Sequence, residues 1–288
     1  MKVTPMTGTA GAEVALLGLP LDCFSSYRRG AARAPAIIRK LLAGGMSHWT
    51  TESGLNLQDH PRWKDLGDLD LSAGEIAIDR IRDAARKAVA SHTALLGMGG
   101  DHAVSYPLVT AWAERFPRLN LLHLDAHPDL YDSFDDTPYS HASPFARIME
   151  AFPQVRLVQV GIRALNAHLR DQAERFGAQI IEMRHWPPRE PLTFEGPLYI
   201  SIDLDAFDPA FAPGVSHHEP GGLTTREVLT LLQSIHAPVV GADIVELNPS
   251  RDLTGITAAL AAKLVKEVAG LMVATTPNTV DQWERLQC

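Results

Sequence analysis

Cysteine is nearly absent from this sequence of 288 residues, which contains only Cys23 and Cys288. Two cysteines cannot supply a disulfide framework or a thiolate-rich metal site, and so few are typical of a reducing compartment. A disulfide between the two stays open at this level. Any metal site in this protein must therefore be built from histidine and carboxylate side chains.

An excess of positive charge is also missing, since 26 Lys and Arg stand against 34 Asp and Glu, for a formal net charge of -8. This balance argues against nucleic acid or an anionic membrane surface as the main partner. No apolar run approaches the length of a membrane span, and residues 1–12 lack the basic region and apolar core of a signal peptide. We therefore expect a cytoplasmic protein without membrane or nucleic-acid partners.

Low-complexity tracts, internal repeats and linker-like segments are not found either, so residues 1–288 are predicted to form a single domain. Apolar strands alternate instead with amphipathic helices. Strands are expected at residues 13–18, 64–69, 93–98, 119–124, 155–160, 179–183, 198–202 and 238–245. Helices are expected at residues 35–43, 75–92, 104–116, 144–151, 166–176, 225–232 and 256–272. Continuously apolar strands indicate an α/β fold whose central, mostly parallel sheet is covered on both faces.

The strand at residues 119–124 runs directly into three potential metal ligands, Asp125, His127 and Asp129. They occupy alternate positions, and a strand sends alternate side chains to one face. Taken alone, Asp and His at a strand end are as typical of a turn as of a metal site. The interpretation therefore depends on the other strand ends.

Two further strands end in similar residues. Strand 198–202 is followed by Asp203 and Asp205, and strand 93–98 leads through two glycines to Asp101 and His102. In an open parallel sheet, such residues gather outside the carboxyl ends of the strands. The candidate ligands are then His102, Asp125, His127, Asp129, Asp203 and Asp205. Four carboxylates and two imidazoles are too many for one catalytic zinc and favour a binuclear site, to which Mn²⁺ is well suited.

Paired divalent ions acidify a bound water, so this site indicates metal-assisted hydrolysis. The carboxylates, together with Glu246 at the end of strand 238–245, favour a cationic substrate over a phosphate ester. His141, on the loop after the central strand, could act as a general acid or base. A loop histidine that is merely solvated is the alternative.

These residues resemble the metal motifs of the ureohydrolases, the family of arginases, agmatinases and formiminoglutamases. The resemblance lies in Gly-Gly-Asp-His at 99–102, Asp-Ala-His-x-Asp at 125–129 and Ser-Ile-Asp-x-Asp-x-x-Asp-Pro at 201–209. It implies a three-layer α/β/α fold, two Mn²⁺ per chain and a homo-oligomer, either a trimer or a hexamer. The implied reaction is hydrolysis of a C–N bond in a small guanidino or amidine compound, usually with release of urea and an amine.

The resemblance also implies a role for each residue. One ion would be held by His102, Asp125, Asp129 and Asp203, and the other by Asp125, His127, Asp203 and Asp205. Asp125 and Asp203 would therefore bridge the two ions. His141 would transfer protons and Glu246 would pair with the substrate's guanidinium group, so the expected catalytic residues are His141, Glu246 and Asp129.

The motifs depart from those of arginases where the tail of the substrate would bind. Residues 132–136, Asp-Ser-Phe-Asp-Asp, replace the Asn and Ser residues that hold the amino-acid carboxylate in arginases. Asn166 stands where arginases place an acid near the α-amino group, and residues 215–218, Val-Ser-His-His, replace Thr-Gly-Thr-Pro. The expected substrate contacts are Glu246, His141, His217 and Asn166. The acidic loop favours an agmatinase-like reaction, because the tail of agmatine is an amine.

Other activities remain as alternatives. Within the family they are those of an arginase, a guanidinobutyrase, a guanidinopropionase or a formiminoglutamase. More distant alternatives are a zinc deacylase-like enzyme, which needs only one metal, and a non-catalytic binder of guanidino compounds. The complete set of six ligands argues against both of these.

Overall fold

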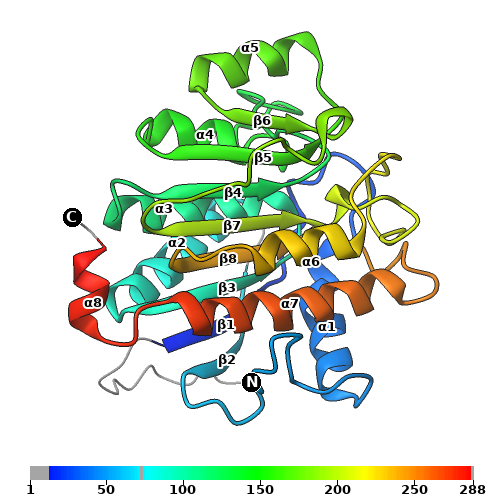
Figure 1. Ribbon diagram of the computed structural model, residues 1–288. Coiled ribbons are helices and arrows are strands. Elements are labelled where there is room, and N and C mark those ends of the chain that lie inside the picture. Colours follow the sequence, from blue (N-terminus) through cyan, green and yellow to red (C-terminus); the bar gives the residue numbers. More distant parts are fainter. Residues whose placement is uncertain (1–12, 72–73, 287–288) are drawn as a thin grey trace.

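The computed structural model describes residues 13–71 and 74–286 of the chain (Figure 1). The segment 1–12, which is expected to carry no signal peptide, lies outside the described residues, and so does Cys288. Cys23 is a free cysteine in this structure. The possible disulfide between the two cysteines therefore stays open.

Eight strands form one sheet in the described part of the chain. They are β1 (Glu13–Leu19), β2 (Trp63–Asp68), β3 (Thr93–Gly99), β4 (Asn120–Leu124), β5 (Arg156–Ile162), β6 (Gln179–Glu182), β7 (Leu198–Asp203) and β8 (Val239–Val245). Their order across the sheet is β2-β1-β3-β8-β7-β4-β5-β6, and every neighbouring pair is parallel. The prediction of a mostly parallel sheet is confirmed.

Helices cover both faces of the sheet (Figure 1). One face carries α1 (Ala34–Ala43), α6 (Thr225–Gln233) and α7 (Ile256–Thr275). The other face carries α2 (Glu75–Ala90), α3 (Ser105–Arg115) and α4 (Pro144–Ala151), with α5 (Ala167–Phe176) beside the edge strand β6. The predicted three-layer α/β/α fold is confirmed.

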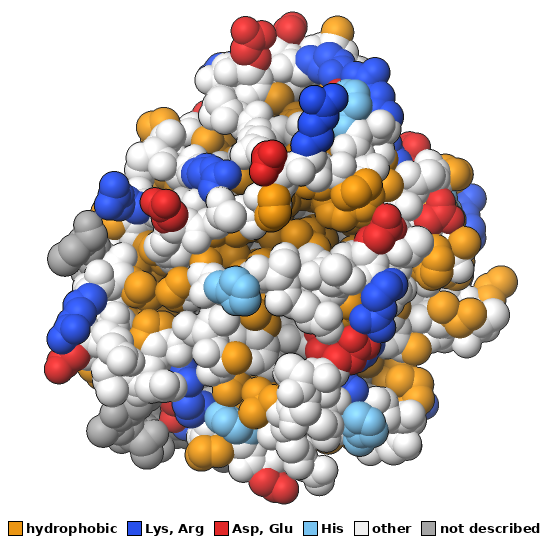
Figure 2. Space-filling model, in the orientation of Figure 1, with side chains coloured by type: hydrophobic (Ala, Val, Ile, Leu, Met, Phe, Trp, Pro, Cys, Tyr) orange, Lys and Arg blue, Asp and Glu red, His pale blue; other side chains and the backbone are white. Residues whose placement is uncertain are grey.

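Helix α7 is rich in Ala, Leu and Val because it is buried along most of its length, against β8 and α1. Within residues 13–71 and 74–286, no helix is long and apolar enough to cross a membrane. On the face of α6 and α7, Figure 2 shows Lys and Arg side chains interspersed with Asp and Glu among the described residues. The positive side chains of this face do not gather into the basic stripe that nucleic-acid binding uses.

One short helix, α8 (Val280–Arg285), is not among the predicted elements. Thr279 caps it by accepting a hydrogen bond from the backbone N–H of Gln282. Its buried Trp283 packs against Trp112 and Phe116. Six residues are too few to show a helical period, so this helix depends on tertiary packing.

The four central strands, β3, β8, β7 and β4, lie side by side and run in the same direction. Their carboxyl ends therefore meet at one edge of the sheet. His102 follows β3, Glu246 follows β8, Asp205 follows β7 and Asp125 follows β4. The chain order of these strands differs from their order in space, because β8 inserts between β3 and β7.

A close backbone approach holds the turn after β3 in place. A Cβ atom at Gly100 would lie 1.7 Å from the backbone oxygen of Leu21. That oxygen accepts a hydrogen bond of 2.8 Å from the N–H of Asp101. Only glycine fits at position 100, and this contact brings His102 to the edge of the sheet.

Candidate metal centre

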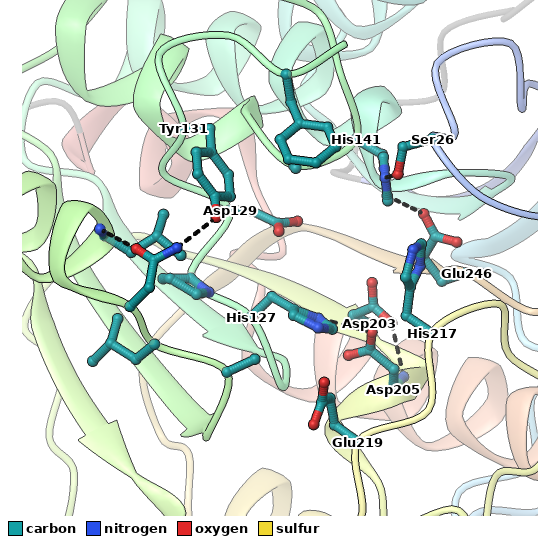
Figure 3. Close-up of a pocket in the computed structure, with 17 residues that line it drawn as sticks. Ser26, His127, Asp129, Tyr131, His141, Asp203, Asp205, His217, Glu219 and Glu246 are labelled. Carbon is teal, nitrogen blue, oxygen red and sulfur yellow. Dashed lines mark hydrogen bonds and ion pairs between the residues drawn. The ribbon is translucent and has the colours of Figure 1, made fainter.

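A pocket of about 500 Å³ opens at the carboxyl edge of the central strands (Figure 3). Its lining includes all of the predicted site residues except His102 and Asp125. These two side chains are fully buried, each with an exposed fraction of 0%. The structure thus brings together residues that are up to 144 positions apart, as in the contact between His102 and Glu246.

Three carboxylates surround one ring nitrogen of His102. Its Nδ1 lies 3.2 Å from Asp125 Oδ2, 3.1 Å from Asp129 Oδ2 and 3.1 Å from Asp203 Oδ2. These four residues are the predicted ligands of the first ion. The structure therefore places them as one cluster.

A second cluster adjoins the first through Asp125. His127 Nδ1 lies 3.0 Å from Asp205 Oδ2 and 3.4 Å from Asp125 Oδ1. Asp125 thus directs one oxygen towards each histidine, which is the arrangement that a bridging ligand requires. Asp203 lies beside the second cluster, and its Oδ1 accepts a 2.7 Å hydrogen bond from Asp205 N.

The orientation of His102 fits a metal ligand. Its Nε2 lies 2.9 Å from Ser201 Oγ, and Ser201 donates in turn to Asp243 Oδ1 at 2.6 Å. Because the serine proton goes to Asp243, the serine oxygen accepts from Nε2–H of His102. Nδ1 then carries a lone pair, is buried and has no hydrogen-bond partner among the described residues, although three carboxylates lie nearby. Such a nitrogen, with its other ring N–H held by a second residue, is suited to bind a cation.

The charges of the site also fit a cation. Burial, followed by repulsion from Asp205 and Asp125, raises the pKa of Asp203 well above its ordinary value. Burial, followed by repulsion from Asp125, raises the pKa of Asp205 to about 7. Buried carboxylates in such proximity are stable as anions only when positive charge lies between them. The oxygen-rich donor set with two imidazoles matches Mn²⁺.

His123, on β4, is a site residue that the sequence reasoning missed. Its Nε2 lies 2.7 Å from Asp125 Oδ2, so by distance alone it could be counted as a metal ligand. Both ring nitrogens are occupied, however, since Gln159 Nε2 donates to Nδ1 at 2.8 Å and also to the backbone oxygen of Pro128 at 2.6 Å. His123 therefore donates to Asp125 and fixes that carboxylate. The available signal was a histidine within an otherwise apolar strand.

Glu246 and His141 form a pair at the inner end of the pocket. Glu246 Oε1 accepts a 2.9 Å hydrogen bond from the backbone N–H of His102 and lies 3.4 Å from His141 Nδ1. Ser26 Oγ lies 2.8 Å from His141 Nε2. Burial opposes a charge on His141, but the Glu246 carboxylate outweighs it and raises the pKa of His141 to about 9. His141 is therefore not a merely solvated loop histidine.

Two of the site residues have a left-handed backbone. The φ angles of Asp129 and Glu246 are 50° and 67°. For a residue other than glycine, this conformation costs on the order of 1–3 kcal/mol and is most often found at functional sites. The surrounding structure therefore imposes the positions of these two carboxylates.

His217 lies in the pocket, whereas His218 does not line it. The ring of His217 stacks on His141 with centroids 5.2 Å apart, and Tyr27 contacts it from another side at 5.6 Å. His218 is exposed, and its Nε2 lies 2.7 Å from the backbone oxygen of Pro213. His217 can contact a substrate, and His218 stabilises its own loop.

The acidic loop at residues 132–136 does not supply carboxylates to the pocket. Asp132 is exposed and pairs with Arg175 at 3.2 Å. Asp135 and Asp136 are exposed at the tip of a tight turn that Phe134 and Thr137 close by backbone hydrogen bonds. None of the three acids lines the pocket. The reason for favouring agmatine from this loop is therefore not supported by the structure.

Asn166 lines the pocket, but both ends of its amide are already hydrogen-bonded. Its Oδ1 accepts from the backbone N–H of Leu169 and caps α5. Its Nδ2 donates to the hydroxyl of Tyr131 at 2.8 Å. One further carboxylate that lines the pocket belongs to Glu219, which the sequence analysis did not identify.

Ser201→Ala should weaken metal binding without unfolding the protein. The change removes the acceptor that holds Nε2–H of His102, and loss of such a partner commonly lowers metal affinity by about 10–100-fold. Calorimetric titration of the metal-free protein with Mn²⁺ measures this effect. Substitution of the exposed Ser133 by alanine is the matched control. An unchanged Mn²⁺ affinity for Ser201→Ala would contradict the assigned role.

The chain matches the model of the Arginase family over residues 12–270. It is 45% identical to arginase 1, mitochondrial, of Arabidopsis thaliana, over 93% of this chain and 83% of that protein. It is 33% identical to an agmatinase of Bacillus anthracis, over 89% of this chain and 90% of that protein. The solved structure of the arginase from Medicago truncatula aligns with a TM-score of 0.85 at 41% identity, covering 92% of this chain and 89% of that one.

The predicted cytoplasmic location is wrong according to these relatives. Plant arginases from Arabidopsis thaliana and Medicago truncatula that match the chain are named as mitochondrial or as chloroplastic/mitochondrial proteins. The prediction depended on the lack of signal-peptide features in residues 1–12, on the lack of an apolar span and on scarce cysteine. These features exclude some locations but do not choose between the cytoplasm and the interior of an organelle.

Proposed function

Because this chain belongs to the arginase family, whose members are manganese-dependent ureohydrolases, we propose that it hydrolyses L-arginine to L-ornithine and urea. The observation that carries this proposal is the sequence identity of 45% to the Arabidopsis arginase, against 33% to the Bacillus agmatinase. The comparisons thus support the arginase alternative better than the agmatinase-like reaction favoured from the sequence. The exposed acids of residues 132–136 remove the main argument for agmatine.

We assign the six predicted ligands, His102, Asp125, His127, Asp129, Asp203 and Asp205, to two Mn²⁺ ions. The two clusters described above, joined by Asp125, support this assignment. When bound, the ions would lower the pKa of a water molecule so that it can attack near neutral pH. The ligands themselves are fixed by neighbouring groups, as His123 fixes Asp125 and Ser201 fixes His102.

The reaction adds the elements of water across one C–N bond. Oxygen bonds to the guanidinium carbon, the bond from that carbon to Nε of the arginine side chain breaks, and the departing amine gains a proton. We assign to Glu246 the attraction of the cationic guanidinium group, since its carboxylate is buried at the inner end of the pocket. His141, held between Glu246 and Ser26, is placed to carry the proton.

All eight strands of the described residues form one sheet, which supports a single domain over residues 1–288. The homo-oligomer, either a trimer or a hexamer, stays a prediction.

A panel of guanidino compounds tests the proposed function. Protein reconstituted with Mn²⁺ is assayed for urea release from L-arginine, agmatine, 4-guanidinobutyrate and 3-guanidinopropionate, and for ammonia release from formiminoglutamate. We expect the highest kcat/KM for L-arginine. A higher kcat/KM for any other compound would overturn the proposal. The absence of urea release from L-arginine, with two metal ions per chain verified, would also overturn it.

A further inference from the structure

Asp205, which is assigned to the second ion alone, lies in a helical turn that is too short to hold its own shape. The turn is a 3₁₀ helix of three residues, Leu204–Ala206, and it directly follows β7. Such a short helix gains little from its own hydrogen bonds, and its last carbonyl groups find no partners within it. The position of the Asp205 carboxylate therefore depends on groups outside this turn.

The half-buried side chain of Arg163 supplies such partners. Its guanidinium group donates to backbone carbonyl oxygens on three separate segments of the chain. These oxygens belong to Asp205 (2.7 Å), Ala206 (3.2 Å), Phe207 (3.3 Å), Gly161 (3.0 Å) and Glu219 (2.9 Å from Nε and 2.5 Å from Nη2). Arg163 thus ties the turn that carries Asp205 to the end of β5 and to the loop at Glu219.

The guanidinium group of Arg163 donates to carbonyl groups and, among the residues that the structure describes, to no carboxylate, although Asp205 and Asp125 attract its charge. The Asp205 carboxylate accepts from Ala126 N through Oδ1 at 3.1 Å, and its Oδ2 lies 3.0 Å from His127 Nδ1. In Figure 3, the ring of His127 points towards Asp205. A cation can therefore bind between Asp205 and His127 without displacing Arg163.

The first cluster is held by different residues. Ser201 orients His102, and His123 donates to Asp125. The side chain of Arg163 takes part in neither contact. A change in that side chain is therefore expected to affect the second ion much more than the first.

We propose that Arg163 is a positioning residue for the second metal ion and acts through the backbone of the turn that carries Asp205. This inference rests on the proposed assignment of the six ligands to two Mn²⁺ ions. The planar fork of an arginine side chain can donate to several fixed carbonyl groups at once, which the single ammonium group of a lysine cannot reproduce. Without the fork, Asp205 is oriented less precisely and the second ion binds more weakly.

Binding of Mn²⁺ to metal-free protein tests this inference. Titration calorimetry measures the dissociation constant of each ion in the wild type, in Arg163→Lys and in Arg163→Gln. Electron paramagnetic resonance of the loaded samples distinguishes a coupled pair of Mn²⁺ ions from a single isolated ion. Arg184→Lys is the matched control, because Arg184 is exposed and pairs with Glu182 outside the pocket.

We expect the second ion to bind about 10–100-fold more weakly in both Arg163 variants, and the first ion to keep its affinity within about threefold. Excess Mn²⁺ should restore the spectrum of the coupled pair. Loss of a positive charge near Asp205 would by itself strengthen the binding of a cation. Weaker binding in Arg163→Gln is therefore the signature of positioning. Arg163→Lys keeps the charge and decides the matter if the neutral variant does not fold.

Unchanged binding of the second ion in Arg163→Lys would overturn the inference, and so would tighter binding in Arg163→Gln. Equal weakening of both ions would also overturn it, because this result indicates a general distortion of the site. Urea release from arginine is measured for the wild type on the same samples, so these results are distinguishable from failure of the proposed function. A wild type that binds fewer than two Mn²⁺ per chain overturns the metal assignment and the inference with it.

Discussion

Asp125→Asn is expected to remove most of the bound manganese and to lower turnover by at least about a thousandfold, which corresponds to about 4 kcal/mol of lost transition-state stabilisation. Asp125 accepts from His127 N through Oδ1 at 2.6 Å and from His123 Nε2 through Oδ2 at 2.7 Å. An asparagine has one oxygen, so its amide NH₂ must face one of these two donors. The variant therefore loses a ligand oxygen and also loses its orientation.

Two measurements on purified protein test this expectation. Metal content per chain is determined after reconstitution with Mn²⁺, and urea release from arginine is measured on the same sample. Asp132→Asn makes the same chemical change at an exposed position outside the pocket and should retain both properties. Full metal content and full turnover in Asp125→Asn would contradict the assignment of Asp125 as the bridging ligand.

Glu246→Gln is expected to lower kcat/KM for arginine by about 10²–10³-fold, the scale of a buried charge left without its partner. The glutamine retains an oxygen for the backbone N–H of His102, which Glu246 now binds at 2.9 Å. The fold of the inner pocket is thus preserved, while the negative charge that is proposed to attract the guanidinium group is lost. Because Glu246 is not among the proposed ligands, manganese content should not change.

Steady-state kinetics with arginine and metal analysis distinguish this role from a structural one. The matched control is Glu190→Gln, at an exposed position outside the pocket. A kcat/KM within about threefold of the wild type would exclude Glu246 from substrate binding. A parallel loss of manganese would instead assign it to the metal centre.

Some residues that hold the candidate metal ligands in place could be predicted from the sequence, but their hydrogen-bond partners could not. His123 and Asp243 are both polar residues inside apolar strands, and this signal could have identified them. The partners could not have been identified in the same way. Gln159 lies 36 positions from His123, and Asp243 lies 42 positions from Ser201. Which strands are neighbours decides these contacts.

The sequence by itself determined the ligand types, their positions after apolar strands and the parallel α/β fold. These features follow from local periodicity, because a strand that ends in alternating acids and histidines carries its own signal. It also determined the family, through motifs that lie close together along the chain. Only tertiary structure placed β8 between β3 and β7, and so brought Glu246 beside His102.

Only tertiary structure decided which acids line the pocket. Both the loop at residues 132–136 and the loop that carries Glu219 contain acidic side chains. The turn closed by Phe134 and Thr137 directs the acids at its tip outwards. Arg163 holds the backbone of Glu219 at the pocket instead. The direction of a loop side chain depends on such contacts between distant segments, and no local pattern encodes them.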